Sequence, residues 1–185
     1  MPKISVYIAT SLDGFIARKD GDIEWLHTSG QGKVASDEDF GYKVFMENID
    51  VLLMGRNTFE KVLSFGGEWP YGKKPVIVLT SRAIEIPKEI SETVSSMSGS
   101  PEEIVSALDQ QGFEDLYLDG GFTIQRFLEA GLVNELTVTR IPILIGEGIP
   151  LFGPLTEDIP LKHLETQSWN NGFVQSRYKV LSGAS

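Results

Sequence analysis

The sequence predicts an α/β domain of three layers, in which helices cover both faces of a mixed, mostly parallel central sheet. Segments rich in β-branched apolar residues alternate with segments of helical periodicity over most of the chain, and the final part carries strand patterns alone. Residues 51–54 and 75–80 are apolar almost throughout, which is typical of strands buried on both faces of a sheet. We expect residues 1–185 to form one domain.

The strands of this sheet are predicted where short runs of β-branched and other apolar residues occur. In chain order they are residues 4–10, 51–54, 75–80, 116–118, 135–141 and 174–180. The last two follow each other without a helical pattern between them, so we expect an antiparallel part at the C-terminal end of the sheet.

Helical periodicity fits between these strands, in residues 36–48, 57–63, 100–112 and 121–131. We expect Ser36 to cap the first helix. The third has the clearest boundary signals, because Ser100 is followed by Pro101 and, at the capping-box position, by Glu103. Glycines end the last two helical patterns.

Composition excludes several classes of function. The formal net charge of −10 argues against binding to nucleic acids or anionic membranes. No apolar run approaches the roughly 20 residues that span a bilayer, and the N-terminus is too polar for a secretion signal, so we expect a cytoplasmic protein. The chain has no cysteine, and His27 and His163 are far apart, so we expect no metal site.

Three predicted strands are followed by groups suited to anions. Gly55, Arg56, Asn57 and Thr58 follow the second strand, and Gly120 and Gly121 follow the fourth. Each lies where a helix begins, so free backbone N–H groups and the positive end of the helix dipole are available. The third strand is followed by Ser81 and Arg82, which add a hydroxyl and a cation. Together they suggest a ligand with several phosphates, such as a dinucleotide.

The glycines also have a purely structural explanation. Two adjacent glycines at a strand-to-helix turn can serve only the turn, and neither G-x-G-x-x-G nor a Walker loop is present. From the residues alone, the prediction stops at an α/β domain that binds a phosphorylated ligand.

Four segments in order carry a family resemblance: "YIATSLDGFIA", "DVLLMGRNTFEKV", "PVIVLTSR" and "LDGGFTIQRFLEAGLVNELTVTRIPILIGEGIPLFG". The pattern resembles the dihydrofolate reductase-like superfamily over nearly the whole chain. It is most similar to the reductase domain of the bacterial riboflavin-biosynthesis deaminase-reductase and its stand-alone relatives, which carry an acidic residue where Asp119 stands. The "GRNT" segment is closer to the dihydrofolate reductase form.

This resemblance implies a three-layer dihydrofolate reductase-like fold and the cofactor NADPH. The pyrophosphate would lie against the turn formed by Asp119, Gly120 and Gly121 and the following Phe122 and Thr123. Arg56, Asn57 and Thr58, after Gly55, would hold phosphates on the adenosine side, and Ser81 and Arg82 the 2′-phosphate. The backbone of Ala9, with Ile16, would bind the nicotinamide amide.

Asp39 is the candidate catalytic residue. It lies 16 residues before Gly55, the spacing at which dihydrofolate reductases carry their substrate-binding carboxylate. In a helix over residues 36–48 it would point into the cleft. Alternatively, Asp37, Glu38 and Asp39 are acids that stabilise a helix N-terminus.

The leading hypothesis is an NADPH-dependent reductase that transfers hydride to a C=N or C=O group of a small heterocyclic substrate. As in riboflavin biosynthesis, that substrate would be 5-amino-6-(5-phosphoribosylamino)uracil. One alternative is a dihydrofolate, or pterin, reductase. Another is a non-catalytic module that binds NADPH or a flavin. The relatives also imply a homodimer that buries C-terminal strands such as "LTVTRIPILIG".

Overall fold

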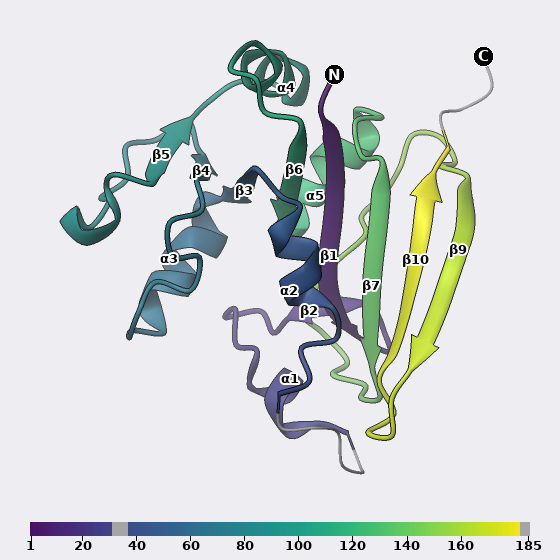
Figure 1. Ribbon diagram of the computed structural model, residues 1–185. Helices are drawn as coiled ribbons and strands as arrows, with labels where there is room; N and C mark the ends of the chain where they lie inside the picture. The colour runs from purple at the N-terminus through teal and green to yellow at the C-terminus, as the bar shows by residue number, and fades with distance from the viewer. Residues whose placement is uncertain (31–36, 182–185) are drawn as a thin grey trace.

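A computed structural model describes residues 1–30 and 37–181 of the chain (Figure 1). The described helices are α1 (Glu24–Thr28), α2 (Tyr42–Glu47), α3 (Arg56–Ser64), α4 (Pro101–Gln110) and α5 (Gly121–Glu129), with a 3₁₀ turn at Lys88–Ile90. The described strands are β1 (Lys3–Ser11), β2 (Phe15–Ala17), β3 (Val51–Gly55), β4 (Val76–Leu79), β5 (Val94–Met97), β6 (Asp115–Asp119), β7 (Glu135–Ile141), β8 (Ile149–Pro150), β9 (Leu161–Ser168) and β10 (Val174–Val180).

Eight strands form one sheet in the order β5-β4-β3-β6-β1-β7-β10-β9, and β2 pairs with β8 beside it. Pairing is parallel from β5 to β7 and antiparallel between β7, β10 and β9. The mixed, mostly parallel sheet is the one that the sequence predicts. All carboxyl ends of β3, β4 and β6 consequently meet at one edge.

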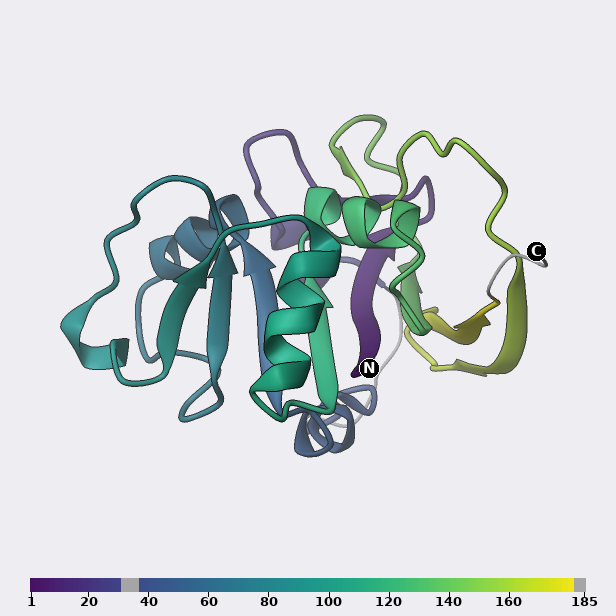
Figure 2. The same ribbon diagram turned by 90° about the horizontal axis from the view of Figure 1, so that it is seen from above.

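Helices cover both faces of this sheet and enclose two apolar cores. On one face, α4 and α5 pack on β1, β3 and β6 through residues such as Leu108 and Phe127. On the other face, Phe59 of α3 and residues of α2 pack on β3 and β4. The expected three layers are therefore present. β9 and β10 lie at the end of the sheet, and neither view shows a helix over them (Figures 1 and 2).

The predicted strands are confirmed within two residues, whereas β2, β5, β8 and β9 were missed. β2 and β8 contain three and two residues, too few for a periodic pattern. Every residue of β9 is exposed, so its sequence carries no apolar run. β5 is short and has two exposed serines at its centre.

The helices after β3, before β6 and after β6 are also confirmed. The capping box of α4 is present, with the Ser100 side chain accepting a hydrogen bond from the Glu103 backbone N–H. The prediction of a helix over residues 36–48 is wrong in its first half. α2 begins only at Tyr42, because Phe40 and Gly41 have positive φ angles of 58° and 87° that a right-handed helix does not allow. Ser36 lies outside the described residues.

Within residues 1–30 and 37–181, none of the helices is long and apolar enough to cross a membrane.

The core packing of α5 gives a direct test of the fold. Phe127 is 1% exposed in the core, and Phe122 on the same helix is 71% exposed. We expect Phe127→Ala to lower the free energy of unfolding by about 3–5 kcal/mol, because it leaves a cavity in a close-packed core. Phe122→Ala, the matched control, should change it by about 0.5 kcal/mol or less. Urea denaturation measures both, and equal effects would contradict the packing of α5.

Candidate functional site

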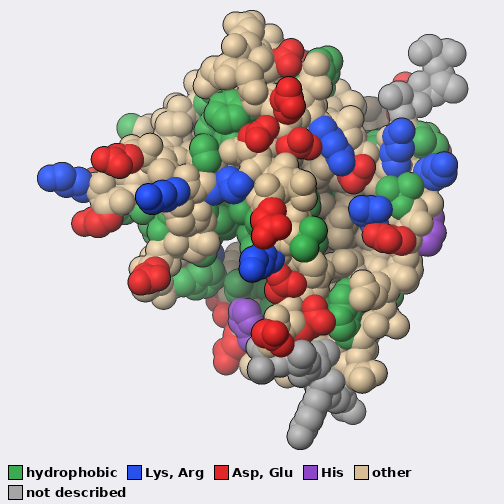
Figure 3. All heavy atoms as spheres, viewed as in Figure 1, with side chains coloured by type: hydrophobic (Ala, Val, Ile, Leu, Met, Phe, Trp, Pro, Cys, Tyr) green, Lys and Arg blue, Asp and Glu red, His purple; other side chains and the backbone are tan. Residues whose placement is uncertain are grey.

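A cavity of about 1390 Å³ opens at the carboxyl ends of β3, β4 and β6. It is larger than the roughly 300–1,000 Å³ typical of a pocket for one small ligand, so it has room for a dinucleotide and a second molecule. β1, β2 and the loop before α1 form a second wall through Ile8, Ile16 and Ile23. The molecular surface is hollowed beside α3 in this face (Figure 3).

Two helix N-termini meet inside this cavity. α3 starts after Gly55 and α5 after Gly120, and neither has a side-chain cap among the described residues. The two turns are in contact, because a Cβ on Gly120 would lie 2.6 Å from the Thr58 hydroxyl oxygen. The first N–H groups of both helices therefore lack helical partners on the same side of the cavity, and both dipoles favour an anion there. This is an arrangement suited to a diphosphate.

The two glycines at the start of α5 each have a structural cause as well. Gly120 has a φ angle of 97°, which residues other than glycine rarely adopt. Gly121 allows β8 and β2 to approach, since a Cβ there would lie 2.9 Å from the Pro150 carbonyl oxygen and 3.2 Å from Ile16. The glycine pair alone is therefore not evidence for a ligand; the two uncapped helix N-termini are.

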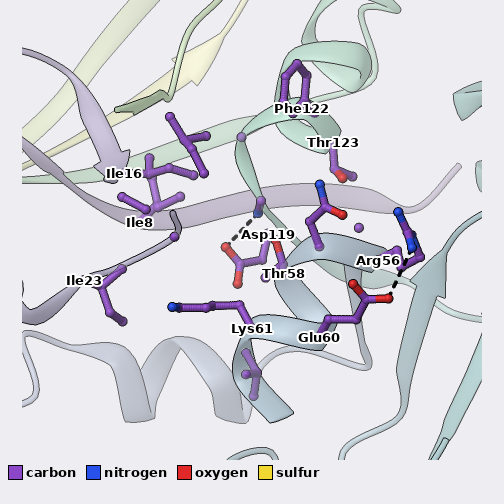
Figure 4. Close-up of a pocket in the computed structure, with 18 of the residues that line it drawn as sticks. Ile8, Ile16, Ile23, Arg56, Thr58, Glu60, Lys61, Asp119, Phe122 and Thr123 are labelled. Carbon is purple, nitrogen blue, oxygen red and sulfur yellow. Dashed lines mark hydrogen bonds and ion pairs between the residues drawn. The ribbon is translucent and has the colours of Figure 1, made fainter. Parts of the chain in front are cut away.

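Asp119, the last residue of β6, is the acidic group closest in sequence to this turn. Its carboxylate accepts a hydrogen bond of 2.8 Å from the Gly120 N–H. Burial raises the pKa of Asp119 to about 6, because removal from water penalises the charged form more than this one hydrogen bond favours it. In Figure 4, Asp119 lies between the side chains of Ile8, Ile16 and Ile23 and those of Thr58 and Arg56. Its proton is therefore exchangeable near neutral pH.

Tyrosines form the wall beyond Asp119. Tyr7, Tyr42, Tyr71 and Tyr117 all line the cavity. Burial, with the Asp119 charge as the second cause, raises the pKa of Tyr42 to about 12, and both causes raise the pKa of Tyr71. Both hydroxyls thus stay protonated and able to donate hydrogen bonds. The result is an aromatic surface with O–H donors beside a carboxyl group.

The cavity concentrates positive charge in an acidic chain. Its cationic side chains are Lys19, Arg56, Lys61, Arg82 and Arg126, and its acidic ones are Asp20, Glu60 and Asp119. Arg56 pairs with Glu60 at 3.3 Å on the exposed side of α3. Within the described part of the chain, Arg82, Arg126 and Lys61 take part in no ion pair within 4.0 Å. These three cations are available to an anionic ligand.

The residues predicted to bind the cofactor come together. All of them line the cavity: Ala9, Ile16, Gly55, Arg56, Asn57, Thr58, Ser81, Arg82, Asp119, Gly120, Gly121, Phe122 and Thr123. The strand ends could be found from the sequence because glycines, hydroxyls and arginines follow apolar runs directly.

Asp39, the predicted catalytic residue, is not among the residues that line the cavity. Its two carboxylate oxygens accept hydrogen bonds from the backbone N–H groups of Gly41 (3.0 Å) and Lys43 (2.8 Å). These bonds hold the pKa of Asp39 below its usual value. The prediction that Asp39 lies in a helix is wrong, because α2 starts at Tyr42, six residues after the predicted start at Ser36, and the Asp39 carboxylate accepts hydrogen bonds in the turn before it.

Sequence reasoning missed several polar residues of the cavity, among them Arg126, Lys61 and Tyr7. Arg126 lies four residues after Phe122 on α5, and Lys61 lies three residues after Thr58 on α3. Helical spacing from the predicted site residues would have found both. Tyr7 lies two residues before the predicted site residue Ala9 on β1, and the alternation of side chains along a strand would have placed both on one face. Among the described residues, no group of three or more His, Cys, Asp or Glu could hold a metal ion.

Asp119 makes the stability of the protein depend on pH. The pKa of Asp119 is higher in the folded state than the value of about 3.9 in an unfolded chain. Ionisation of Asp119 therefore lowers the free energy of unfolding. This loss of stability is absent below about pH 4 and complete above about pH 6. We expect Asp119→Asn to be stabilised relative to the unmodified protein by about 1–3 kcal/mol at pH 8 and to lose that advantage at pH 4.

Asp50→Asn is the matched control, because the pKa of Asp50 is shifted in the opposite direction and the effect on stability should have the opposite sign. The Asp50 carboxylate accepts hydrogen bonds from the backbone N–H groups of Asp115 and Glu114, which lower its pKa. Its contribution is present at neutral pH and lost in acid, so Asp50→Asn should destabilise most at neutral pH. Urea denaturation from pH 4 to pH 8 measures both. A pH-independent difference for Asp119→Asn would contradict the burial of its charge.

Comparison with known proteins agrees with this geometry. A crystal structure described as a putative riboflavin biosynthesis protein from Shewanella sp. PV-4 is 40% identical, with a TM-score of 0.90 over 97% of this chain and 99% of that one. A dihydrofolate reductase from Enterococcus faecalis, complexed with NADP(H), has the same fold, with a TM-score of 0.65, 19% identity and 97% coverage of both chains.

A third structure is the diaminohydroxyphosphoribosylaminopyrimidine deaminase/5-amino-6-(5-phosphoribosylamino)uracil reductase from Thermotoga maritima. It has a TM-score of 0.73 and 16% identity over 97% of this chain and 57% of its own length. This chain thus corresponds to little more than half of that protein. The model of the RibD C-terminal domain matches residues 2–175. With the sheet order, the cavity and this match, the chain belongs to the RibD C-terminal domain family, which includes reductases.

Proposed function

We propose that the protein is an NADPH-dependent reductase that transfers hydride to a C=N or C=O group of a small heterocyclic substrate. The observation that carries this proposal is the meeting of two uncapped helix N-termini and one carboxyl group of raised pKa in a single large cavity. The reductase named among the similar structures and the dihydrofolate reductase complexed with NADP(H) support it.

The cofactor would lie along the strand ends. The N–H groups at the starts of α3 and α5 would hold the diphosphate, with Thr58 and Thr123 as hydroxyl partners. Arg82 and Ser81, after β4, would meet a 2′-phosphate, which NADPH has and NADH lacks. The Ala9 backbone and Ile16, on the opposite wall, would hold the nicotinamide end.

Reduction of a C=N or C=O group requires a hydride at carbon and a proton at nitrogen or oxygen. The bound cofactor would supply the hydride. Asp119 suits the proton, because with a pKa of about 6 its carboxyl group is partly protonated near neutral pH. Tyr42 and Tyr71 would hydrogen-bond the ring of the substrate. We therefore assign the acid to Asp119 rather than to Asp39, whose carboxylate is used by the turn before α2.

The substrate that the relatives favour is 5-amino-6-(5-phosphoribosylamino)uracil, with a pterin as the alternative. Lys61, a half-buried cation that lines the same cavity as the tyrosines, is compatible with an anionic heterocycle. Oxidation of NADPH by purified protein in the presence of the aminouracil phosphate or of dihydrofolate would decide between them. Cofactor binding without oxidation by any such heterocycle would instead favour a non-catalytic NADPH- or flavin-binding module.

Substitution of Arg82 tests the proposed preference for NADPH over NADH. We expect Arg82→Ala to weaken NADPH binding about 10- to 100-fold, the loss expected for a charge-assisted hydrogen bond, and NADH binding by about twofold or less. Quenching of tryptophan fluorescence measures both affinities. Arg177→Ala is the control, because Arg177 pairs with Glu165 on β10 and β9 and does not line the cavity. Equal loss of both cofactors would contradict the 2′-phosphate assignment.

We also propose that the chain forms a homodimer through β9 and β10. β9 is the edge strand of the sheet, every one of its residues is exposed, and the exposed apolar side chains include Leu161, Leu164 and Val174. An exposed edge of this kind is suited to pairing with another chain.

A mass measurement in solution by light scattering tests the homodimer. We expect twice the 20.4 kDa of one chain for the unmodified protein and a shift toward one chain for Leu164→Lys, which introduces charge on β9. Lys162→Ala on the same strand, which removes a charge, is the matched control and should leave the dimer intact. A single-chain mass for the unmodified protein would overturn the proposal.

A further inference from the structure

The backbone just before α2 is strained. Among the described residues, Phe40 is the only non-glycine residue with a positive φ, at 58°. A bulky residue seldom adopts this left-handed conformation unless the surrounding structure imposes it, and such residues cluster at functional sites. Tyr42, which lines the cavity, follows two residues later as the first residue of α2. The strain therefore lies where the chain turns Tyr42 toward the cavity.

Two donors hold Phe40 in this conformation. Its carbonyl oxygen accepts hydrogen bonds from the Tyr7 hydroxyl at 2.5 Å and from the Gln175 side-chain amide at 3.1 Å. Its ring packs against Trp169 and Phe173, with centroids 5.0 Å and 5.2 Å away. Both the ring and the carbonyl group of Phe40 are thus held by contacts with other elements.

Gln175 is the centre of this network. From β10 its amide nitrogen also lies 3.0 Å from the Tyr7 hydroxyl oxygen and 2.9 Å from the Thr139 hydroxyl oxygen. The Tyr7 hydroxyl donates its proton to the Phe40 carbonyl oxygen, so toward Gln175 the Tyr7 oxygen can only accept a hydrogen bond. The Phe40 carbonyl oxygen can also only accept, so both of these groups require a donor from Gln175. Only the amide nitrogen meets this requirement. Gln175 thereby joins the sheet extension, at β10, to β1 and to the turn before α2.

The same network fixes the aromatic wall of the cavity. The Tyr42 ring lies 5.5 Å from that of Tyr7 and 6.5 Å from that of Tyr117. The Tyr117 hydroxyl donates to the Tyr7 carbonyl oxygen at 2.9 Å, so Tyr7 and Tyr117 have their hydroxyls engaged. The Tyr42 hydroxyl makes no hydrogen bond with any described residue, and Tyr42 lines the cavity, so this hydroxyl remains available to a ligand.

We propose that Tyr42 contacts the substrate, with its hydroxyl donating to a nitrogen or oxygen of the heterocycle, and that Gln175 is the positioning residue that holds Tyr42 there. This inference rests on the proposed reductase function and extends it to the substrate side of the cavity. Gln175 itself does not line the cavity, so it acts only through Tyr7 and the Phe40 carbonyl.

Gln175→Leu tests the positioning role, with Gln167→Leu as the matched control. Gln167 is the cross-strand partner of Gln175 on β9 and makes none of these bonds. In Gln175→Leu we expect the amides of residues 37–47 to exchange with deuterium about tenfold faster, because the turn loses a support. The extent to which N-acetylimidazole acetylates Tyr42, measured by mass spectrometry, should change as well. Neither measurement requires cofactor or substrate.

Kinetics test the contact with substrate. With NADPH and 5-amino-6-(5-phosphoribosylamino)uracil, and separately with dihydrofolate, Tyr42→Phe and Gln175→Leu should raise KM about tenfold, the size expected for one net hydrogen bond. The affinity for NADPH should change by about twofold or less. Tyr178→Phe, on β10 but outside the cavity, should match the unmodified protein. Either heterocycle should also protect Tyr42 from acetylation.

The outcomes distinguish failure of this inference from failure of the proposed reductase function. Unchanged exchange and unchanged Tyr42 acetylation in Gln175→Leu would overturn the positioning role, whatever the protein catalyses. An unchanged KM in Tyr42→Phe, or no protection of Tyr42 by either heterocycle, would overturn the substrate contact. Failure of the unmodified protein to bind NADPH would instead refute the proposed function and leave the exchange result to decide the role of Gln175.

Discussion

The parallel pairing of β4, β3, β6 and β1 is the constraint on which the rest of the structure depends. It brings the carboxyl ends of β3, β4 and β6 to one edge, so the helices that follow β3 and β6 begin side by side. Their first N–H groups have no partners within the helices, and the glycines allow the two turns to touch. The cavity at this edge therefore combines two uncapped helix N-termini with the cations Lys61, Arg82 and Arg126, features that suit an anion in a chain whose net charge is −10.

Asp119 and the aromatic wall of the cavity determine what chemistry can follow. Asp119 is a half-buried carboxyl group at the cavity, and this burial raises its pKa to about 6, in the range in which proton transfer is useful at neutral pH. The tyrosines around it stay protonated because the same burial disfavours tyrosinate. Hydroxyl donors, one exchangeable acid and several cationic side chains thus line one cavity. The strained turn at Phe40 lets α2 contribute Tyr42 to this wall.

Much of this could be predicted from the sequence. Buried parallel strands carry continuous apolar runs, so β3, β4 and β6 could be predicted, together with the residues that follow them and line the cavity. The errors have physical causes. The helix pattern over residues 36–48 hides a left-handed Phe40, whose conformation depends on Gln175, more than a hundred residues away. Asp39 was misjudged for the same reason, and exposed β9 carries no apolar pattern at all.

The central claim is that the starts of α3 and α5 hold the diphosphate of a dinucleotide. A crystal structure of the protein with NADPH tests it most directly. The account predicts diphosphate oxygens about 3 Å from backbone N–H groups at the start of both helices, with the 2′-phosphate beside Arg82. A cofactor bound elsewhere, or a diphosphate held only by side chains while both helix N-termini face water, would contradict it.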